Sequence, residues 1–213
     1  PRQKGTPGVS GGMSAWIEKT DNPMQVFDQW YQQAQKAGNF EPTAMTLATV
    51  GDDGLPDARV VLLKEYNAQE FCFFTNYQSQ KANEISGNPK GALVFHWEKP
   101  QHRQIRLRGY LEKLSYERSD AYFQSRPRGS QIGAWSSPQS QEIQSRTELE
   151  KKVQEIEERF AGKDIPCPEN WGGYALKPLC IEFWEAQEFR LHDRMIFTRH
   201  DLSSPWVARR LAP

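Results

Sequence analysis

Short β-strand patterns joined by short connections fill the first half of the chain. The segments are rich in β-branched and aromatic residues, and Gly51-Asp52-Asp53-Gly54 between the first two is typical of a hairpin turn. The predicted strands cover residues 43–50, 59–66, 71–76, 92–97 and 104–114. Because these strands do not alternate with long helices, the pattern favours an antiparallel barrel over a parallel sheet.

Helical patterns precede and follow these strands. A first helix is expected to begin at Asp21, with Asn22 as its cap and Pro23 in its first turn, and to end at Gly38. Later helices are expected over residues 116–125, 130–135 and 145–161, and strands return over 174–176, 180–184, 190–199 and 206–211. The sequence therefore predicts a mainly β protein with surrounding helices (α+β). We expect a flexible N-terminal arm over residues 1–20 and a single domain over residues 21–213.

The charge balance and the cysteines narrow the class of protein. The chain carries 27 basic and 27 acidic side chains, which argues against nucleic-acid binding through a general positive field. Cys72, Cys167 and Cys180 are widely spaced and form no CxxC pair, so neither a zinc site nor a disulfide framework is indicated. No apolar run reaches the length of a membrane span. We therefore expect a cytoplasmic protein without a metal, nucleic-acid or membrane partner.

The run Arg190-Leu191-His192-Asp193-Arg194 gathers three cationic or polar side chains. In an extended strand Arg190, His192 and Arg194 would share one face. Such neighbours repel one another unless an anionic or electron-rich group lies against them. The alternative is an exposed strand face with carboxylate partners such as Asp193 or Glu188, and on this run alone the two interpretations have similar weight.

Two further segments suggest phosphate binding. Arg59 and Lys64 flank an apolar strand with opposite parity, which a bulge or two different ligand groups would explain; snorkelling at the strand ends is the alternative. In residues 74–81 a strand runs into a helix that Ser79 can cap, with Lys81 beside the free N–H groups. A phosphate would fit that helix start, although a capped helix without a ligand has the same pattern.

A third group is harder to explain by packing. Tyr122 and Arg126 are four residues apart on a predicted helix, and Ser130 follows a Pro-Arg-Gly turn. A phenol, a guanidinium and a hydroxyl together suit a phosphate group. The pair Gln139-Ser140 is a weaker signal for contact with a heterocycle. Since a Gly-rich dinucleotide loop is absent from the sequence, these groups favour two phosphorylated planar ligands and redox chemistry carried by a cofactor.

Eight motifs in order resemble the pyridoxine/pyridoxamine 5′-phosphate oxidase family. They are RVVLLK, FFTN, SRPRGSQIGAW, the Gln-Ser pair, WGGY, EFW, RLHDR and the terminal RLAP. The resemblance runs from about the first helix to the C-terminus. It implies a homodimeric antiparallel split β-barrel with FMN at the subunit interface. It also implies oxidation of pyridoxine or pyridoxamine 5′-phosphate to pyridoxal 5′-phosphate, with O2 as acceptor and H2O2 as product.

The resemblance also implies roles for individual residues. The FMN contacts would be Arg59, Val60, Val61, Leu62, Leu63, Lys64, Phe74, Thr75, Gln80, Lys81, Gln104, Gln139, Ser140, Trp184 and Arg194. The substrate phosphate would be held by Lys64, Tyr122, Arg126 and Ser130. Arg190 and His192 would lie over the substrate ring as the catalytic pair, with Arg190 stabilising negative charge and His192 in a polar or proton-handling role.

Three positions depart from the family pattern. Gln80 stands where the family often has Arg, and the loss of that ion pair would weaken FMN binding by roughly 1–3 kcal/mol if nothing replaces it. Trp184-Glu185-Ala186 stands where the family often has Trp-Gln-Gly, and the Arg and Tyr of the family's N-terminal arm have no match before Asp21. Two alternatives stay open: a sister flavoenzyme, such as a phenazine-biosynthesis oxidase, and a flavin- or vitamer-binding protein without turnover.

Overall fold

The computed structural model describes residues 16–213. Most of the predicted flexible arm, residues 1–15, lies outside the described residues. At the end of that arm, Ile17 is buried against the core. In the part of the chain that is described, no helix has the length and apolar character needed to cross a membrane.

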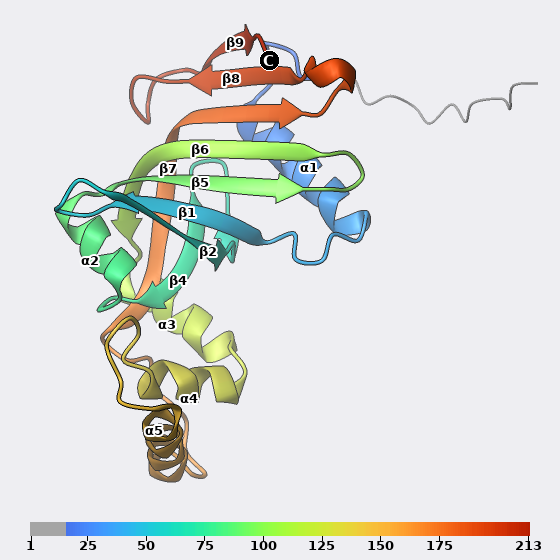
Figure 1. The fold of residues 1–213 in the computed structure, drawn as a ribbon. Helices are drawn as coiled ribbons and strands as arrows, with labels where there is room; N and C mark the ends of the chain where they lie inside the picture. The colour runs from blue at the N-terminus through green and yellow to red at the C-terminus, as the bar shows by residue number, and fades with distance from the viewer. Residues whose placement is uncertain (1–15) are drawn as a thin grey trace, which may run out of the picture.

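One antiparallel sheet of nine strands organises the described chain (Figure 1). Its strands are β1 (Ala44–Val50), β2 (Pro56–Leu62), β3 (Glu65–Tyr66), β4 (Phe71–Asn76), β5 (Lys90–Trp97), β6 (Arg103–Lys113), β7 (Trp171–Glu185), β8 (Asp193–Thr198) and β9 (Val207–Leu211). The order is β2-β1-β5-β6-β7-β4-β3, and β8 pairs with both β7 and β9. The sheet curls into half of a barrel, which confirms the predicted fold class of strands with surrounding helices.

The longest strand, β7, bends in the middle. Its first half pairs with β4 and its second half with β8, while β6 follows it along both halves. The register shifts between Arg108 and Gly109, opposite Pro178. A side chain at Gly109 would place its Cβ 2.0 Å from the Lys177 carbonyl oxygen, so the close approach requires glycine. The prediction of two separate strands over 174–176 and 180–184 was therefore wrong, because a bulge accommodates the proline inside one strand.

An aromatic core fills the concave side of the sheet. Helix α1 (Pro23–Lys36) begins at the Asn22 cap and buries its predicted apolar stripe. Phe27 packs edge-on against Phe71 and Phe95 at 4.7 and 5.2 Å between ring centres, and Trp30 packs against Phe183. The first helix is thus a packing element, as its stripe indicated.

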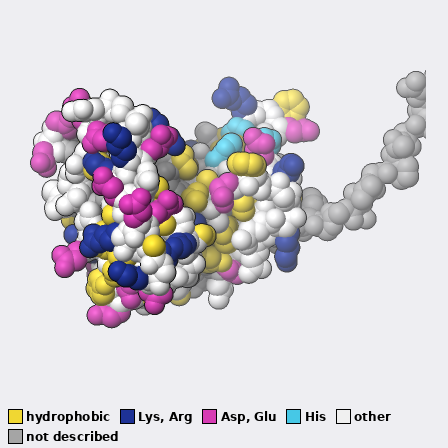
Figure 2. Space-filling model, turned by 90° about the horizontal axis from the view of Figure 1, so that it is seen from below, with side chains coloured by type: hydrophobic (Ala, Val, Ile, Leu, Met, Phe, Trp, Pro, Cys, Tyr) yellow, Lys and Arg dark blue, Asp and Glu magenta, His cyan; other side chains and the backbone are white. Residues whose placement is uncertain are grey.

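Three helices form a second, smaller unit below the sheet in Figure 1. They are α3 (Tyr116–Ser125), α4 (Arg128–Ser136) and α5 (Arg146–Arg159), close to the predicted ranges. Phe123, Ile132, Phe160 and Trp171 make their shared apolar cluster. Helix α2 (Gln80–Gly87) lies beside β1 and β2. Seen from below, acidic and basic side chains are interspersed over the surface, in keeping with the balanced charge of the chain (Figure 2).

Candidate active site

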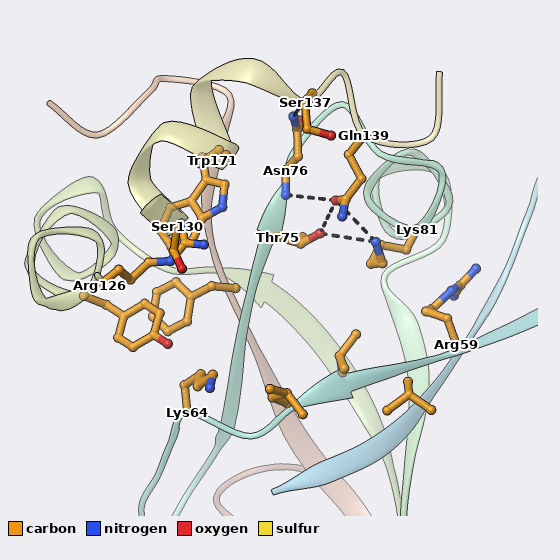
Figure 3. A pocket seen from close by; sticks show the side chains of 17 residues that line it. Arg59, Lys64, Thr75, Asn76, Lys81, Arg126, Ser130, Ser137, Gln139 and Trp171 are labelled. Carbon is orange, nitrogen blue, oxygen red and sulfur yellow. Dashed lines mark hydrogen bonds between the residues drawn. The ribbon is translucent and has the colours of Figure 1, made fainter. Parts of the chain in front are cut away.

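A cavity of about 610 Å³ lies between β2, β4, the start of α2 and the helices α3 and α4 (Figure 3). It brings together twelve of the predicted ligand-binding residues: Arg59, Val60, Val61, Leu62, Lys64, Phe74, Thr75, Lys81, Tyr122, Arg126, Ser130 and Gln139. Four of its lining side chains are cationic, and none of the described side chains that line it is acidic. The cavity therefore suits an anionic ligand.

The opposite parity of Arg59 and Lys64 is explained by the end of β2 at Leu62. Leu63 then turns into the core, where it is 3% exposed, and the Lys64 N–H donates to the Cys72 carbonyl at 2.9 Å. This break, rather than a bulge, lets both cations line the cavity. Leu63, which was predicted to contact FMN, therefore lies in the core and does not line the cavity.

One end of the cavity is built around Arg126. Its guanidinium lies 4.6 Å from the centre of the Trp171 ring, while Tyr122 stacks on Phe74 at 4.0 Å between ring centres. Burial lowers the pKa of Arg126. Its buried Nη1 has no hydrogen-bond partner among residues 16–213. Ser130 lies in the first turn of α4, and the labelled Arg126 and Ser130 side chains lie close together in Figure 3. An acceptor with negative charge would satisfy this end.

The shared helix face predicted for Tyr122 and Arg126 is not present. Helix α3 ends at Ser125, and Arg126 is its C-cap with extended backbone angles. Arg126 nevertheless lines the same cavity, because the chain turns at Pro127 between α3 and α4. The predicted convergence on one site is nevertheless confirmed, together with Ser130.

The other end of the cavity is built around Lys81, which is only 9% exposed. Its Nζ lies 3.3 Å from the Thr75 hydroxyl and 3.5 Å from both the Ser79 hydroxyl and Gln139 Oε1. Within the described chain these partners are all neutral, and burial is the main cause that lowers the Lys81 pKa. A buried ammonium whose direct hydrogen-bond partners are all neutral is costly, so an anion bound against it would stabilise this end.

The helix start beside Lys81 differs from its prediction in one detail. Ser79 occupies the N-cap position of α2, but its side chain makes no capping hydrogen bond. Its hydroxyl lies instead near Lys81. Gln139 is tied to the same place, since its Oε1 accepts from the Thr75 hydroxyl at 2.9 Å and from the Asn76 N–H at 3.3 Å.

Arg59 lines this end of the cavity, but its guanidinium already forms ion pairs with two carboxylates. Its Nη2 donates to Asp57 at 2.6 Å and to Glu84 at 3.0 Å. Gln80, which stands where the family often has Arg, donates from Nε2 to the same two carboxylates at 3.0 and 3.1 Å. Gln80 and Ser140 face a neighbouring hollow and not this cavity, so the structure does not join them to the other predicted FMN contacts.

Three predicted FMN contacts lie elsewhere on the sheet. Gln104, Trp184 and Arg194 form one row across β6, β7 and β8. Arg194 donates to Glu182 at 2.8–2.9 Å. It therefore has a carboxylate partner, as the alternative interpretation of its motif expected, but that partner is neither Asp193 nor Glu188.

The extended conformation predicted for Arg190 and His192 was wrong. Residues 188–190 form a 3₁₀ turn, and Phe189 and Arg190 have φ angles of 55° and 63°. Strand β8 begins only at Asp193, so the Arg190, His192 and Arg194 side chains do not share one strand face. The His192 ring packs on Trp184 at 4.6 Å between ring centres, and its Nδ1 accepts the Gln187 N–H at 3.2 Å. This bond leaves the proton of the neutral ring on Nε2.

The sequence missed five residues that line the cavity. They are Asn76, Gly133, Ala134, Ser137 and Trp171. A signal for Trp171 was present in the Gly-Gly pair that follows it. A Cβ at Gly172 would lie 2.2 Å from the Tyr77 hydroxyl oxygen, so a larger residue there would require the tyrosine side chain to move.

The fold defines a class of proteins, the split-barrel flavoproteins. PhzG from Burkholderia lata, solved in complex with tetrahydrophenazine-1-carboxylic acid, aligns with a TM-score of 0.86 and 27% identity over 94% of this chain and 98% of that chain. A pyridoxamine 5′-phosphate oxidase-related, FMN-binding protein from Nostoc punctiforme aligns with a TM-score of 0.72 over 92% of this chain and 100% of that chain. At 17% identity, the second likeness concerns the fold alone.

The sequence comparisons identify the family within that class. Residues 32–160 match the family model "Pyridoxamine 5'-phosphate oxidase", and residues 171–213 match "Pyridoxine 5'-phosphate oxidase C-terminal dimerisation region". The chain is 48% identical to the pyridoxine/pyridoxamine 5′-phosphate oxidase of Microcystis aeruginosa over 92% of this chain and 91% of that protein. For the protein of that name from Paraburkholderia phytofirmans, identity is 50% over 90% of this chain and 89% of that protein. The chain therefore belongs to the pyridoxamine 5′-phosphate oxidase family, as its motifs indicated.

Proposed function

We propose that this chain is an FMN-dependent oxidase that converts pyridoxine or pyridoxamine 5′-phosphate to pyridoxal 5′-phosphate, with O2 as acceptor and H2O2 as product. The observation that carries the proposal is the buried Arg126 guanidinium, whose Nη1 has no acceptor among the described residues, in a cavity with stacked aromatic rings. A phosphorylated aromatic ring supplies both the missing acceptor and a planar partner.

The donor set at the Lys81 end fits the phosphate of FMN. Lys81 is a buried cation with neutral partners, and the Thr75 hydroxyl and the start of α2 lie beside it. Together with Arg59, Gln139 and the β2 residues 60–62, these groups would hold the cofactor. When bound, FMN would supply the hydride acceptor and return the two electrons to O2.

The Arg126 end would hold the substrate phosphate. Lys64 and Arg126 provide two positive charges, and the Tyr122 and Ser130 hydroxyls provide neutral donors. Two cations match a phosphate dianion, and a guanidinium can bind two phosphate oxygens at once. Holding the phosphate at this end fixes where the substrate ring lies relative to the Lys81 end of the cavity.

The catalytic residues would come from a second copy of the chain. Gln104, Trp184, Arg190, His192 and Arg194 do not line the cavity of their own subunit. Residues 171–213, which carry four of these five side chains, match a dimerisation region. In a symmetric homodimer, the turn after β7 of each subunit would cover the cavity of the other and complete two sites.

The reaction removes a hydride from the substrate C4′ carbon and a proton from its hydroxyl or amino group. Arg190, an exposed cation at the turn, would stabilise negative charge that develops on the substrate. His192 would present its Nε2–H as a hydrogen-bond donor, because Nδ1 is occupied by the Gln187 N–H. The remaining lining residues would position the two planar rings against each other.

Anaerobic spectroscopy tests this proposal. The purified protein is supplied with FMN, and pyridoxine 5′-phosphate is added without oxygen. Bleaching of the flavin bands, followed by recovery in air with H2O2 formation, is the expected result. Flavin bands that do not respond to the substrate would contradict the oxidase function and favour a binding protein without turnover.

The likeness to PhzG supports a second candidate, an oxidase of a tetrahydrophenazine carboxylic acid. A substrate without phosphate leaves the two cations at the Arg126 end without a dianion, which favours the first candidate. Turnover of unphosphorylated pyridoxine or of the phenazine precursor at rates equal to those of pyridoxine 5′-phosphate would reverse this preference.

A further inference from the structure

Arg59 belongs to a closed hydrogen-bond network with two carboxylates. Its Nη2 binds Asp57 at 2.6 Å and Glu84 at 3.0 Å, and its Nη1 binds the Thr49 hydroxyl. Thr49 in turn donates to Glu84. Gln80 closes the network from α2 by donating to both carboxylates. The position that would carry a second arginine by resemblance to the family thus holds a neutral amide.

The two ends of the cavity consequently differ in charge. At the Lys81 end, the positive charges of Arg59 and Lys81 are matched by the negative charges of Asp57 and Glu84. Glu84 also acts on Lys81 through space. At the other end, neither Lys64 nor Arg126 has a carboxylate partner within residues 16–213, although both line the cavity. One end is close to neutral, and the other carries about two positive charges.

We propose that Glu84 and Asp57 determine flavin specificity by neutralising the cofactor-phosphate end, so that the chain discriminates only weakly between FMN and unphosphorylated riboflavin. This inference rests on the proposed function, because it assigns the cofactor phosphate to the Lys81 end. Glu84 has the larger effect of the two. Its side chain is 10% exposed, whereas that of Asp57 is 43% exposed and is screened by water.

The effect is one of charge and does not require Arg59 to stay in its observed position. If the guanidinium turned toward a bound phosphate, Asp57 and Glu84 would keep Gln80 as a shared donor and would remain in place. Both negative charges would then remain beside Arg59 and Gln80 at this end of the cavity. The electrostatic balance at this end is therefore similar in both arrangements.

Flavin binding to the apoprotein of residues 1–213 measures the charge balance at the Lys81 end directly. Dissociation constants for FMN and for riboflavin are determined by flavin fluorescence in wild type, Glu84→Gln and Asp57→Asn. Glutamine at position 84 keeps an acceptor for Arg59 and Thr49 but removes the charge. The matched control is Glu157→Gln, which makes the same charge change on an exposed position of α5.

Glu84→Gln is expected to tighten FMN binding by about tenfold and to leave riboflavin binding unchanged. Asp57→Asn is expected to act in the same direction with a smaller change, and Glu157→Gln to change neither constant. Unchanged or weaker FMN binding in Glu84→Gln would overturn the inference, as would an equal change for both flavins. If neither flavin binds to wild type, the proposed function itself fails, which is a separate and recognisable outcome.

Discussion

The guanidinium of Arg126 lies 4.6 Å from the centre of the Trp171 ring, with its Nη1 buried and without an acceptor in the described chain. The indole holds the cation in a defined position without neutralising it. The pair therefore forms a preorganised receptor for an anion. This arrangement makes the proposed substrate-phosphate end the most direct target for mutation.

Replacing Arg126 tests that receptor. Arg126→Ala is expected to raise the KM for pyridoxine 5′-phosphate by about 10- to 100-fold, since one charged hydrogen-bonding group is worth about 1.5–3 kcal/mol. The FMN dissociation constant is expected to stay unchanged, because the Lys81 end is intact. Steady-state kinetics and flavin titration measure the two effects. Arg146→Ala, on the exposed surface of α5, is the control, and an equal loss of FMN binding would refute the assignment.

Lys81 is expected to destabilise the apoprotein. Replacement by Met should raise the free energy of unfolding at neutral pH on the order of 1 kcal/mol, because it removes a buried charge whose direct hydrogen-bond partners are neutral. The same change should sharply weaken FMN binding. Urea unfolding measures the gain in stability, and flavin titration measures the loss of FMN binding. A simple folding defect would lower both. Lys151→Met on α5 is the control.

The pH dependence of the apoprotein follows from the same side chain. Burial lowers the pKa of Lys81 below its ordinary value of 10.5. Between the lowered pKa and the ordinary value, the unfolded state binds more protons, so this group makes the protein more stable as the pH rises. Lys81→Met is expected to lose this contribution. Urea unfolding across the alkaline range measures it, and identical slopes in wild type and variant would show that Lys81 does not titrate in that window.

Mixed dimers test whether each site uses two subunits. Arg126→Ala and Arg190→Ala are each expected to be nearly inactive. If Arg126 and Arg190 of one site come from different chains, a heterodimer of the variants contains one intact site. Random mixing would then restore about a quarter of the wild-type activity. Activity that stays at the level of the single variants after subunit exchange would place both residues of a site in one chain.

His192 offers a test of proton position. Because Nδ1 accepts the Gln187 N–H, the ring is expected to act through its Nε2–H. Glutamine can present an amide donor near the place of Nε2, whereas asparagine is too short. His192→Gln is therefore expected to retain several-fold more turnover than His192→Asn. Nitrogen NMR of the ring in wild type measures the tautomer independently, and a proton on Nδ1 would contradict this role.

Much of the fold could be predicted because short-range patterns and packing agree. The hairpin at Gly51–Gly54, the Asn22 cap and the stripe of α1 are local signals, and the structure contains each of them. The β7 strand could not be predicted as continuous. A proline in a strand normally marks its end, and only the bulge opposite Gly109 makes Pro178 acceptable.

The sequence predicted which residues line the cavity more accurately than it predicted the backbone conformation that places them there. Arg59 and Lys64 both line the cavity because β2 ends before Lys64, which strand alternation alone could not show. The prediction that Arg190 and His192 share a strand face was wrong because Phe189 and Arg190 adopt positive φ angles. Positive φ angles are uncommon for these residue types, so the sequence did not indicate them. The pairing of Arg194 with Glu182 depends on contacts between strands and is invisible in the local sequence.

The bend of β7 has a consequence for protein design. Trp171, at the first residue of the strand, lines the cavity, while Trp184, near its last residue, supports His192. Trp171 and Trp184 thus belong to one continuous strand, and the bulge beside Pro178 separates the two halves that carry them. A substitution that changed the bend at Pro178 would therefore be expected to move both tryptophans relative to each other.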